Sequence, residues 1–270
     1  MYTTLIAPDA LQPLLSPPLE RVRLFDCRAR LDDPDFGRAA YAAGHLPGAL
    51  FASIDDDFAA APGAGGRHPL PDPERLRDRF RAWGVNDGDQ VVFYDDANGA
   101  FAARAWWCAR WLGHAAAAVL DGGLAAWPEP LTTAVPEPEP GGFSIRPALT
   151  RTIDANGVLA SLGRATLVDA RNEARFRGEE EPIDPIAGHI PGAECRPFQG
   201  NLGPDGRFLT PDALAARFAG LEEPLICYCG SGITAAHNVL AMRRAGLPEP
   251  LLYPGSWSEW IRDPARPKAI

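Results

Sequence analysis

Residues 224–234 read Pro-Leu-Ile-Cys-Tyr-Cys-Gly-Ser-Gly-Ile-Thr, and the architecture of the chain can be worked out from them. The short apolar run at 224–228 predicts a buried strand. A helical pattern follows over 235–245, and Gly246 is its expected C-cap. The glycine-rich turn at 229–234 joins the strand to the helix. Strand, turn and helix in this order indicate a parallel sheet covered by helices.

The chain contains an internal repeat. Four motifs of the first half recur in the same order in the second half, which chance does not explain. They are 24–28 with 167–171, 44–49 with 188–193, 90–95 with 224–229, and 120–127 with 253–260. A run rich in Pro and Glu separates the halves and is typical of an extended linker. We therefore expect an N-terminal domain over 1–130, a linker over 131–143 and a C-terminal domain over 144–270.

Both halves have the same predicted plan. Apolar runs predict buried strands, and segments of helical period lie between them. The expected strands are 22–26, 90–94, 166–169 and 224–228, and the expected helices include 73–83, 100–112, 211–218 and 235–245. This alternation predicts an α/β fold in which each domain is a mostly parallel sheet flanked by helices.

Composition excludes several classes of function. Of 270 residues, 46% are hydrophobic and 23% are charged, which is enough to bury a core in each domain. A net charge of −9 would repel a phosphate backbone, so we expect no nucleic-acid partner. We see no membrane span and no signal peptide. Five cysteines without regular spacing predict neither a disulfide framework nor a metal site, and we expect a reduced, cytoplasmic protein.

The loop Cys229-Gly230-Ser231-Gly232-Ile233-Thr234 carries the candidate chemistry. Its glycines let successive backbone N–H groups point at one position, and the following helix adds positive potential there. A thiol at that position should be partly ionised, and the same N–H groups would stabilise an anionic persulfide. A buried structural cysteine is the alternative; the glycines favour a thiol at the loop mouth instead. Cys227, inside the apolar run, is expected to belong to the core.

Taken together, the motifs resemble the tandem rhodanese family. The resemblance rests on Asp-x-Arg at 169–171, Gly-His-x-Pro-Gly at 188–192, the six-residue loop at 229–234 and Tyr-Pro-Gly-Ser-Trp-x-Glu-Trp at 253–260. It spans essentially the whole chain and implies two rhodanese-like domains. Within the family, the loop is similar to that of 3-mercaptopyruvate sulfurtransferases. Thiosulfate-using rhodaneses tend to carry Arg and Lys after the cysteine.

The resemblance also implies which residues surround the cysteine. Arg175 corresponds to an arginine that binds the substrate carboxylate in the family, for which a planar guanidinium is well suited. Mercaptopyruvate enzymes often have a second arginine near the position of Ile183, and its absence leaves a related sulfur donor open. A proposed Ser, His and Asp set that activates the donor thiol corresponds to Ser231, His68 and Asp55.

Other polar residues have a structural interpretation. Asp95 stands at the nucleophile position of the first domain, and a carboxylate cannot hold a sulfane sulfur, so that domain is expected to be inactive. His45 and His189 occur in both repeats and are expected to be hydrogen-bonded turn residues. Arg171 is expected to pair with Asp169. A surface role for Arg175 and a structural role for His68 remain alternatives.

We therefore expect a sulfurtransferase that moves sulfur from 3-mercaptopyruvate, through a Cys229 persulfide, to cyanide or a thiol such as thioredoxin. The donor is a small anion, and neutral Gly230 and Ser231 favour a singly charged one over thiosulfate. No cofactor is expected, because the protein holds the sulfur covalently. The alternatives are a thiosulfate:cyanide sulfurtransferase, a non-catalytic binding or regulatory module, and a cysteine phosphatase, whose bracing arginine is replaced by Ala235. The expected substrate-binding residues are Arg175, Gly230, Ser231, Gly232, Ile233 and Thr234.

Overall fold

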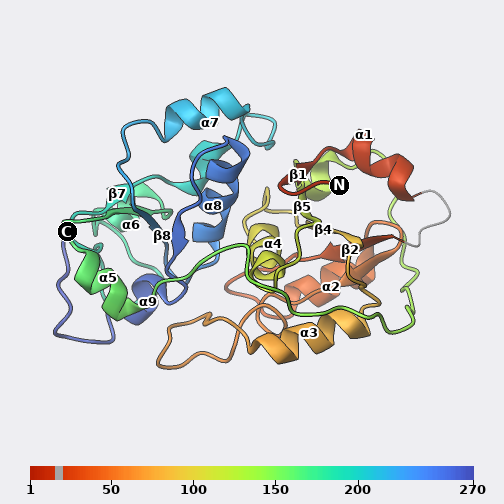
Figure 1. The fold of residues 1–270 in the computed structure, drawn as a ribbon, viewed down its shortest axis with the longest axis horizontal. Helices are drawn as coiled ribbons and strands as arrows, with labels where there is room; N and C mark the ends of the chain where they lie inside the picture. Colours follow the sequence, from red (N-terminus) through yellow and green to blue (C-terminus); the bar gives the residue numbers. More distant parts are fainter. Residues whose placement is uncertain (16–20) are drawn as a thin grey trace. The chain divides into compact units, whose positions relative to one another are not determined.

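The computed structural model describes residues 1–15 and 21–270, which form two compact units (Figure 1). The first unit consists of Met1–Ala59, Pro71–Thr150 and Pro204–Arg207. The second consists of Ala60–Leu70, Arg151–Gly203 and Phe208–Ile270. The segment Ala60–Leu70 thus belongs with the second unit although it precedes the linker. A division of the chain at residues 131–143 does not predict that Ala60–Leu70 packs with the second unit, or Pro204–Arg207 with the first.

The first unit is built on a five-stranded parallel sheet with the order β1-β5-β4-β2-β3. Its strands are β1 (Leu5–Ile6), β2 (Val22–Asp26), β3 (Ala49–Phe51), β4 (Gln90–Tyr94) and β5 (Ala117–Leu120). Its helices are α1 (Pro8–Leu11), α2 (Phe36–Ala43), α3 (Pro73–Ala82) and α4 (Ala102–Trp111), with short 3-10 turns η1 (Gln12–Leu15) and η2 (Gly123–Ala126).

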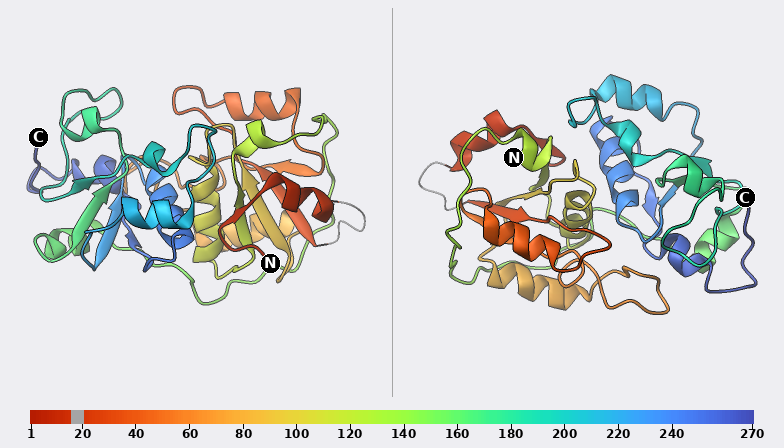
Figure 2. Two further views of the ribbon diagram at one scale, coloured as in Figure 1. Left: turned by 90° about the horizontal axis from the view of Figure 1, so that it is seen from above. Right: turned by 180° about the vertical axis from the view of Figure 1, so that it is seen from behind.

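The second unit repeats this plan on a four-stranded parallel sheet with the order β7-β6-β8-β9. Its strands are β6 (Thr166–Asp169), β7 (Glu194–Cys195), β8 (Leu225–Tyr228) and β9 (Leu251–Leu252). Its helices are α5 (Ala155–Ser161), α6 (Glu173–Phe176), α7 (Pro211–Arg217), α8 (Thr234–Arg244) and α9 (Ser256–Trp260), with a 3-10 turn η3 (Phe198–Asn201). The predicted α/β fold, with helices flanking each parallel sheet, is confirmed (Figure 2).

Local sequence explains where these elements lie. Strands β4 and β8 are buried along their whole length, which is why they read as continuous apolar runs. Helix α3 begins after Asp72, whose side chain accepts the N–H of Arg75. Helix α8 ends before Gly246, which has a φ of +74°, as the predicted C-cap requires.

Matched side chains hold the same turn in each unit. Asp26 pairs with Arg28 at 2.6 Å, and the guanidinium also donates to the carbonyl of Gly44 at 2.7 Å. Asp169 and Arg171 pair at the same 2.6 Å, so their predicted pairing is confirmed. Arg171 likewise donates to the Gly188 carbonyl at 2.7 Å. These buried pairs occur in both units, including the one that has Asp95 in place of a cysteine. Their role is therefore to stabilise the fold.

The two repeated histidines are also structural. Nδ1 of His45 lies 2.8 Å from the carbonyl oxygen of Tyr41, and Nδ1 of His189 lies 2.8 Å from that of Phe176. Each imidazole also stacks on the ring of the residue whose carbonyl it contacts, with ring centroids 3.8 Å apart. The expectation of hydrogen-bonded turn residues is confirmed for both.

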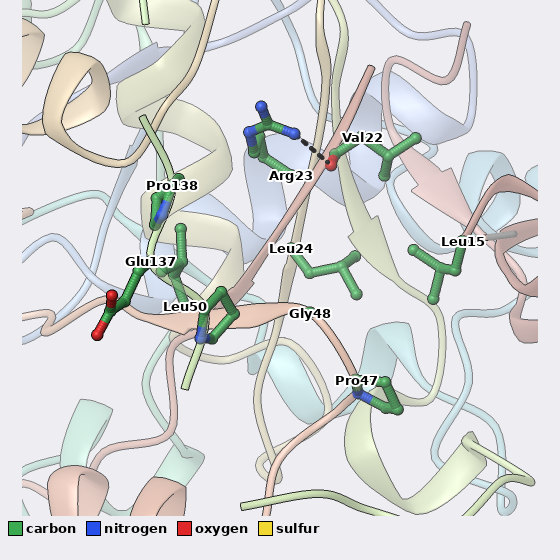
Figure 3. A pocket seen from close by; sticks show the side chains of 10 residues that line it. Leu15, Val22, Arg23, Leu24, Pro47, Gly48, Leu50, Glu137 and Pro138 are labelled. Atoms are coloured by element: carbon green, nitrogen blue, oxygen red, sulfur yellow. Dashed lines mark hydrogen bonds between the residues drawn. The ribbon is translucent and has the colours of Figure 1, made fainter. Parts of the chain in front are cut away.

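A pocket of about 250 Å³ opens in the first unit beside β2 (Figure 3). Its described lining is apolar, including Leu15, Leu24 and Leu50, except for Arg23 and Glu137. The Nη1 atom of Arg23 is tied to a carbonyl of the adjacent residue at 3.3 Å. This described lining contains neither Cys nor His, so it offers neither a thiol nor an imidazole.

Candidate active site

The loop at 229–234 joins β8 to α8, as predicted. The sulfur of Cys229 accepts a hydrogen bond from the N–H of Gly232 at 3.1 Å. The backbone N–H of Cys229 donates to Oγ of Ser256 at 3.1 Å, and its carbonyl accepts the N–H of Trp257 at 3.0 Å. The Cys229 side chain is only 2% exposed, deeper than the loop mouth expected from the sequence. The turn curls over the sulfur and brings an amide donor to it.

Glycine is required within this turn for two separate reasons. Gly232 has a φ of +81°, and a Cβ there would lie 2.3 Å from the carbonyl oxygen of Pro254. Gly230 has no such backbone requirement, but a Cβ there would meet arginine side chains. The loop ends at Ile233, which is buried at 3% exposure, and Thr234 is the first residue of α8. Ile233 therefore anchors the loop to the core of the unit.

Ser231 and His68 are brought together by the structure. Nδ1 of His68 lies 2.7 Å from Oγ of Ser231, and the serine is 4% exposed. His68 belongs to Ala60–Leu70, which is fastened to the second unit by the hydrogen bond from the Arg67 N–H to Oγ of Ser258 at 3.1 Å. Two members of the predicted Ser, His and Asp set thus contact each other within one unit.

The third member of that set, Asp55, belongs to the first unit. Asp55 is an exposed residue of the first unit, in the turn that follows β3. The amide of Ser53 and the carboxylate of Asp57 close this turn with a 2.8 Å hydrogen bond. A partnership of Asp55 with His68 stays a prediction.

Arg175 lies on α6, and its backbone N–H donates to the side chain of Asn172 at 2.8 Å. Its guanidinium bonds Glu181 at 2.6 and 3.1 Å and Asp184 at 3.4 Å. The side chain is 13% exposed, so it is not a solvated surface arginine. Burial acts to raise the pKa of Glu181, but hydrogen bonds from Arg175 and from the Asp184 amide outweigh it, and that pKa is lowered.

One cation of the site was missed from the sequence. Arg67 precedes His68, and its guanidinium forms an ion pair with Asp184. A Cβ built on Gly230 would lie 2.9 Å from Nη2 of Arg67. Ile183, where a second arginine was sought, is 41% exposed. The sequence did offer one indication of this cation. Arg67 is adjacent to His68, so a segment that places His68 at the loop also places Arg67 near it.

Asp95 occupies a turn of the same kind in the first unit. Its two carboxylate oxygens accept four backbone N–H groups, those of Ala97, Gly99, Phe101 and Ala102, at 2.8–2.9 Å. The carboxylate is fully buried. The turn therefore encloses an anion that belongs to the chain itself, whereas the turn of the second unit encloses a thiol.

The remaining cysteines differ from Cys229 in their surroundings. Cys227 is fully buried in β8, as predicted, and burial followed by the nearby Cys229 raises its pKa well above the usual value. Burial raises the pKa of Cys195 to about 11. Among the residues that the structure describes, no three His, Cys, Asp or Glu side chains are placed to hold a metal ion. Within those same ranges, no helix has the length and apolar character needed to cross a bilayer.

Comparison with protein families gives the class. The model described as a Rhodanese-like domain matches residues 9–129 and again 153–263. These two matches coincide with the two halves of the internal repeat and cover most of the chain. The protein belongs to the rhodanese family.

Individual relatives narrow the comparison. A Pseudomonas aeruginosa protein named "Probable 3-mercaptopyruvate sulfurtransferase" is 51% identical over 259 residues, which cover 91% of each chain. The thiosulfate sulfurtransferase of Rattus norvegicus is 34% identical over 241 residues, covering 83% of this chain and 80% of that protein. The crystal structure of SseA from Escherichia coli, described among the 3-mercaptopyruvate sulfotransferases, matches with a TM-score of 0.82 and 32% identity. That match covers 96% of this chain and 100% of SseA. The relatives of this chain thus include proteins named for 3-mercaptopyruvate and proteins named for thiosulfate.

Proposed function

We propose that this protein is a sulfurtransferase that takes sulfur from 3-mercaptopyruvate and carries it as a persulfide on Cys229. The observation that carries the proposal is the 3.1 Å hydrogen bond from the Gly232 N–H to the cysteine sulfur. An amide donor aimed at sulfur stabilises a thiolate before transfer. The glycine-rich turn can do the same for a persulfide anion afterwards.

The first half-reaction loads the cysteine. The Cys229 thiolate attacks the donor sulfur, a sulfur–sulfur bond forms, and the bond between the donor sulfur and C3 breaks. Its electron pair goes to C3, which takes up the former thiol proton. The products are the Cys229 persulfide anion and pyruvate, so atoms and charge balance without a further oxidant.

Proton movement in this step falls to His68 and Ser231. Their 2.7 Å contact can pass the donor's thiol proton toward C3, since both an imidazole nitrogen and a hydroxyl can accept and donate a proton. Asp55 is proposed to orient His68. Arg175 is proposed to bind the donor carboxylate, and Gly230, Gly232, Ile233 and Thr234 form the rest of the substrate-facing loop.

The second half-reaction unloads the cysteine. A dithiol such as reduced thioredoxin attacks the outer sulfur, releases hydrogen sulfide and becomes a disulfide while Cys229 returns to the thiolate. Cyanide would take the outer sulfur as thiocyanate. A reduced dithiol is maintained in the cytoplasm, which is where we propose that the protein works.

In this proposal, the second domain, over 144–270, catalyses the reaction, and the first domain, over 1–130, is catalytically inactive. The carboxylate of Asp95 fills the matching turn and cannot form a persulfide. Gly230 and Ser231 follow the cysteine and add no charge of their own to the loop, which favours a monoanionic donor. Thiosulfate is the second candidate donor, because a relative named for it covers most of this chain.

Mass spectrometry of the loaded protein tests the proposal. After incubation with 3-mercaptopyruvate, the protein should gain the mass of one sulfur atom at Cys229 and release pyruvate. Cys229→Ser should show neither, whereas Cys195→Ser should retain both. A wild-type protein that gains no sulfur from 3-mercaptopyruvate or thiosulfate would instead indicate a non-catalytic module.

A further inference from the structure

Two guanidinium groups face the same point of the nucleophile loop. A Cβ on Gly230 would lie 2.9 Å from Nη2 of Arg67, and 3.5 and 3.6 Å from Nη2 and Nη1 of Arg175. Gly230 directly follows Cys229, so both cations lie over the residue next to the sulfur. The missing side chain of Gly230 leaves the room in which they converge.

Each of these arginines has a donor left over. Arg67 uses Nη1 for Asp184, and Arg175 uses Nε and Nη2 for Glu181 and Asp184. Within residues 1–15 and 21–270, no acceptor is bonded to Nη2 of Arg67 or to Nη1 of Arg175. Both of these N–H groups lie among the atoms nearest Gly230. Two unused, convergent guanidinium donors form a pair suited to the two oxygens of a carboxylate.

Buried carboxylates hold the arginines in this arrangement. The side chains of Glu181 and Asp184 are each 4% exposed. Asp184 contacts both guanidiniums, one through each of its oxygens. Arg67, Arg175, Glu181 and Asp184 sum to zero charge, and so does the adjoining pair of Arg171 and Asp169. The neutral cluster can therefore accept one further negative charge more readily than two.

We propose that Arg67 is a second substrate-binding residue, which binds the donor carboxylate together with Arg175. Asp184 acts as a positioning residue that holds both guanidiniums over Gly230. This inference rests on the proposed function and deepens it by naming a second residue that recognises the donor carboxylate. It also accounts for Ile183, which stands near the position where mercaptopyruvate enzymes often have a second arginine. Here the second cation comes from the segment Ala60–Leu70, which also carries His68.

Donors that differ only in the carboxylate test the role of Arg67. Wild-type protein and Arg67→Met are compared with 3-mercaptopyruvate and with mercaptoacetone, which replaces the carboxylate by a methyl group. Losing a charge-assisted hydrogen bond should lower kcat/KM for 3-mercaptopyruvate about 10- to 100-fold. For mercaptoacetone it should change less than about threefold, because that donor offers the guanidinium no anion.

Two controls protect this comparison. Arg177→Met removes an arginine that directly follows α6, is 51% exposed and pairs with Glu173 and Glu179. It should leave kcat/KM for both donors unchanged. The double variant Arg67→Met with Asp184→Asn also removes the carboxylate that loses one of its two arginines, and it is compared with Asp184→Asn alone. The further loss on adding Arg67→Met should again be confined to 3-mercaptopyruvate. Equal losses on both donors, or none, would overturn the role of Arg67. A wild-type protein inactive on every donor would overturn the proposed function instead.

Discussion

Nδ1 of His68 lies 2.7 Å from Oγ of Ser231, although 163 positions of sequence separate the two residues. The contact exists because Ala60–Leu70 belongs with the second unit, where the Arg67 N–H fastens it to Ser258. A serine hydroxyl bonded to an imidazole can pass a proton only to a group within its own reach. In the proposed mechanism, this pair moves the proton of a donor that carries a thiol, whereas thiosulfate has no proton for it to move.

Ser231→Ala tests that distinction. Removing the hydroxyl should lower kcat/KM for 3-mercaptopyruvate about 100-fold or more, the usual contribution of a positioned acid or base. Sulfur transfer from thiosulfate by the same variant should change by less than about threefold, because no proton moves in that step. Steady-state kinetics with cyanide as acceptor measure both. Parallel losses on the two donors would assign Ser231 to the stability of the loop instead.

Asp184→Asn should change the preference between donors. The substitution adds one positive charge to a cluster of two arginines and two carboxylates, which favours a dianion over a monoanion. We expect the ratio of kcat/KM for thiosulfate to that for 3-mercaptopyruvate to rise about tenfold. Glu179→Gln makes the same charge change at an exposed position and should leave the ratio unaltered. A ratio that does not move in Asp184→Asn refutes the charge argument.

Two glycines of the loop should respond differently to alanine. Gly232→Ala combines a φ of +81° with a backbone oxygen 2.3 Å from the new Cβ, and should destabilise the protein by about 2–3 kcal/mol and abolish transfer. Gly230→Ala meets the movable end of an arginine and should mainly raise KM for 3-mercaptopyruvate. Gly192→Ala is the control, because its φ is +78° with nothing within 4 Å of the new Cβ. Urea unfolding and kinetics separate the three.

Much of this site follows from local patterns in the sequence. A strand, a glycine turn and a helix are short-range features, so the positions of Cys229 and Gly232 could be predicted to the residue. The pairing of Asp169 with Arg171 was equally local. Arg67 could not be found in this way, because its role depends on where Ala60–Leu70 packs, and no periodicity records that. The depth of Cys229 was also misjudged, since burial depends on α9 and the Tyr253–Trp257 turn packing against the loop.

Asp95 should be a stabilising residue of the first unit. Asp95→Ala would leave four backbone N–H groups without their acceptor, and we expect a loss of about 3 kcal/mol in the free energy of unfolding. Sulfur loading of Cys229 by the folded variant should persist. Asp96→Ala removes a neighbouring, more exposed carboxylate and should cost less than about 1 kcal/mol. Urea titration measures both variants, and equal losses would contradict the role of the turn.

Glu181→Gln should cost stability at neutral pH and progressively less in acid. The pKa of Glu181 is lowered in the folded protein, so its stabilising contribution is present above the ordinary value of 4.5 and is lost as the pH falls through the folded pKa. We expect a difference of about 2 kcal/mol from wild type at pH 7, because a charge-assisted hydrogen bond is lost, and a shrinking difference below pH 4.5. Urea unfolding at a series of pH values measures it. A difference that stays constant down to pH 3 would mean that the carboxylate of Glu181 is not what the arginines bind, and that packing alone sets the cost.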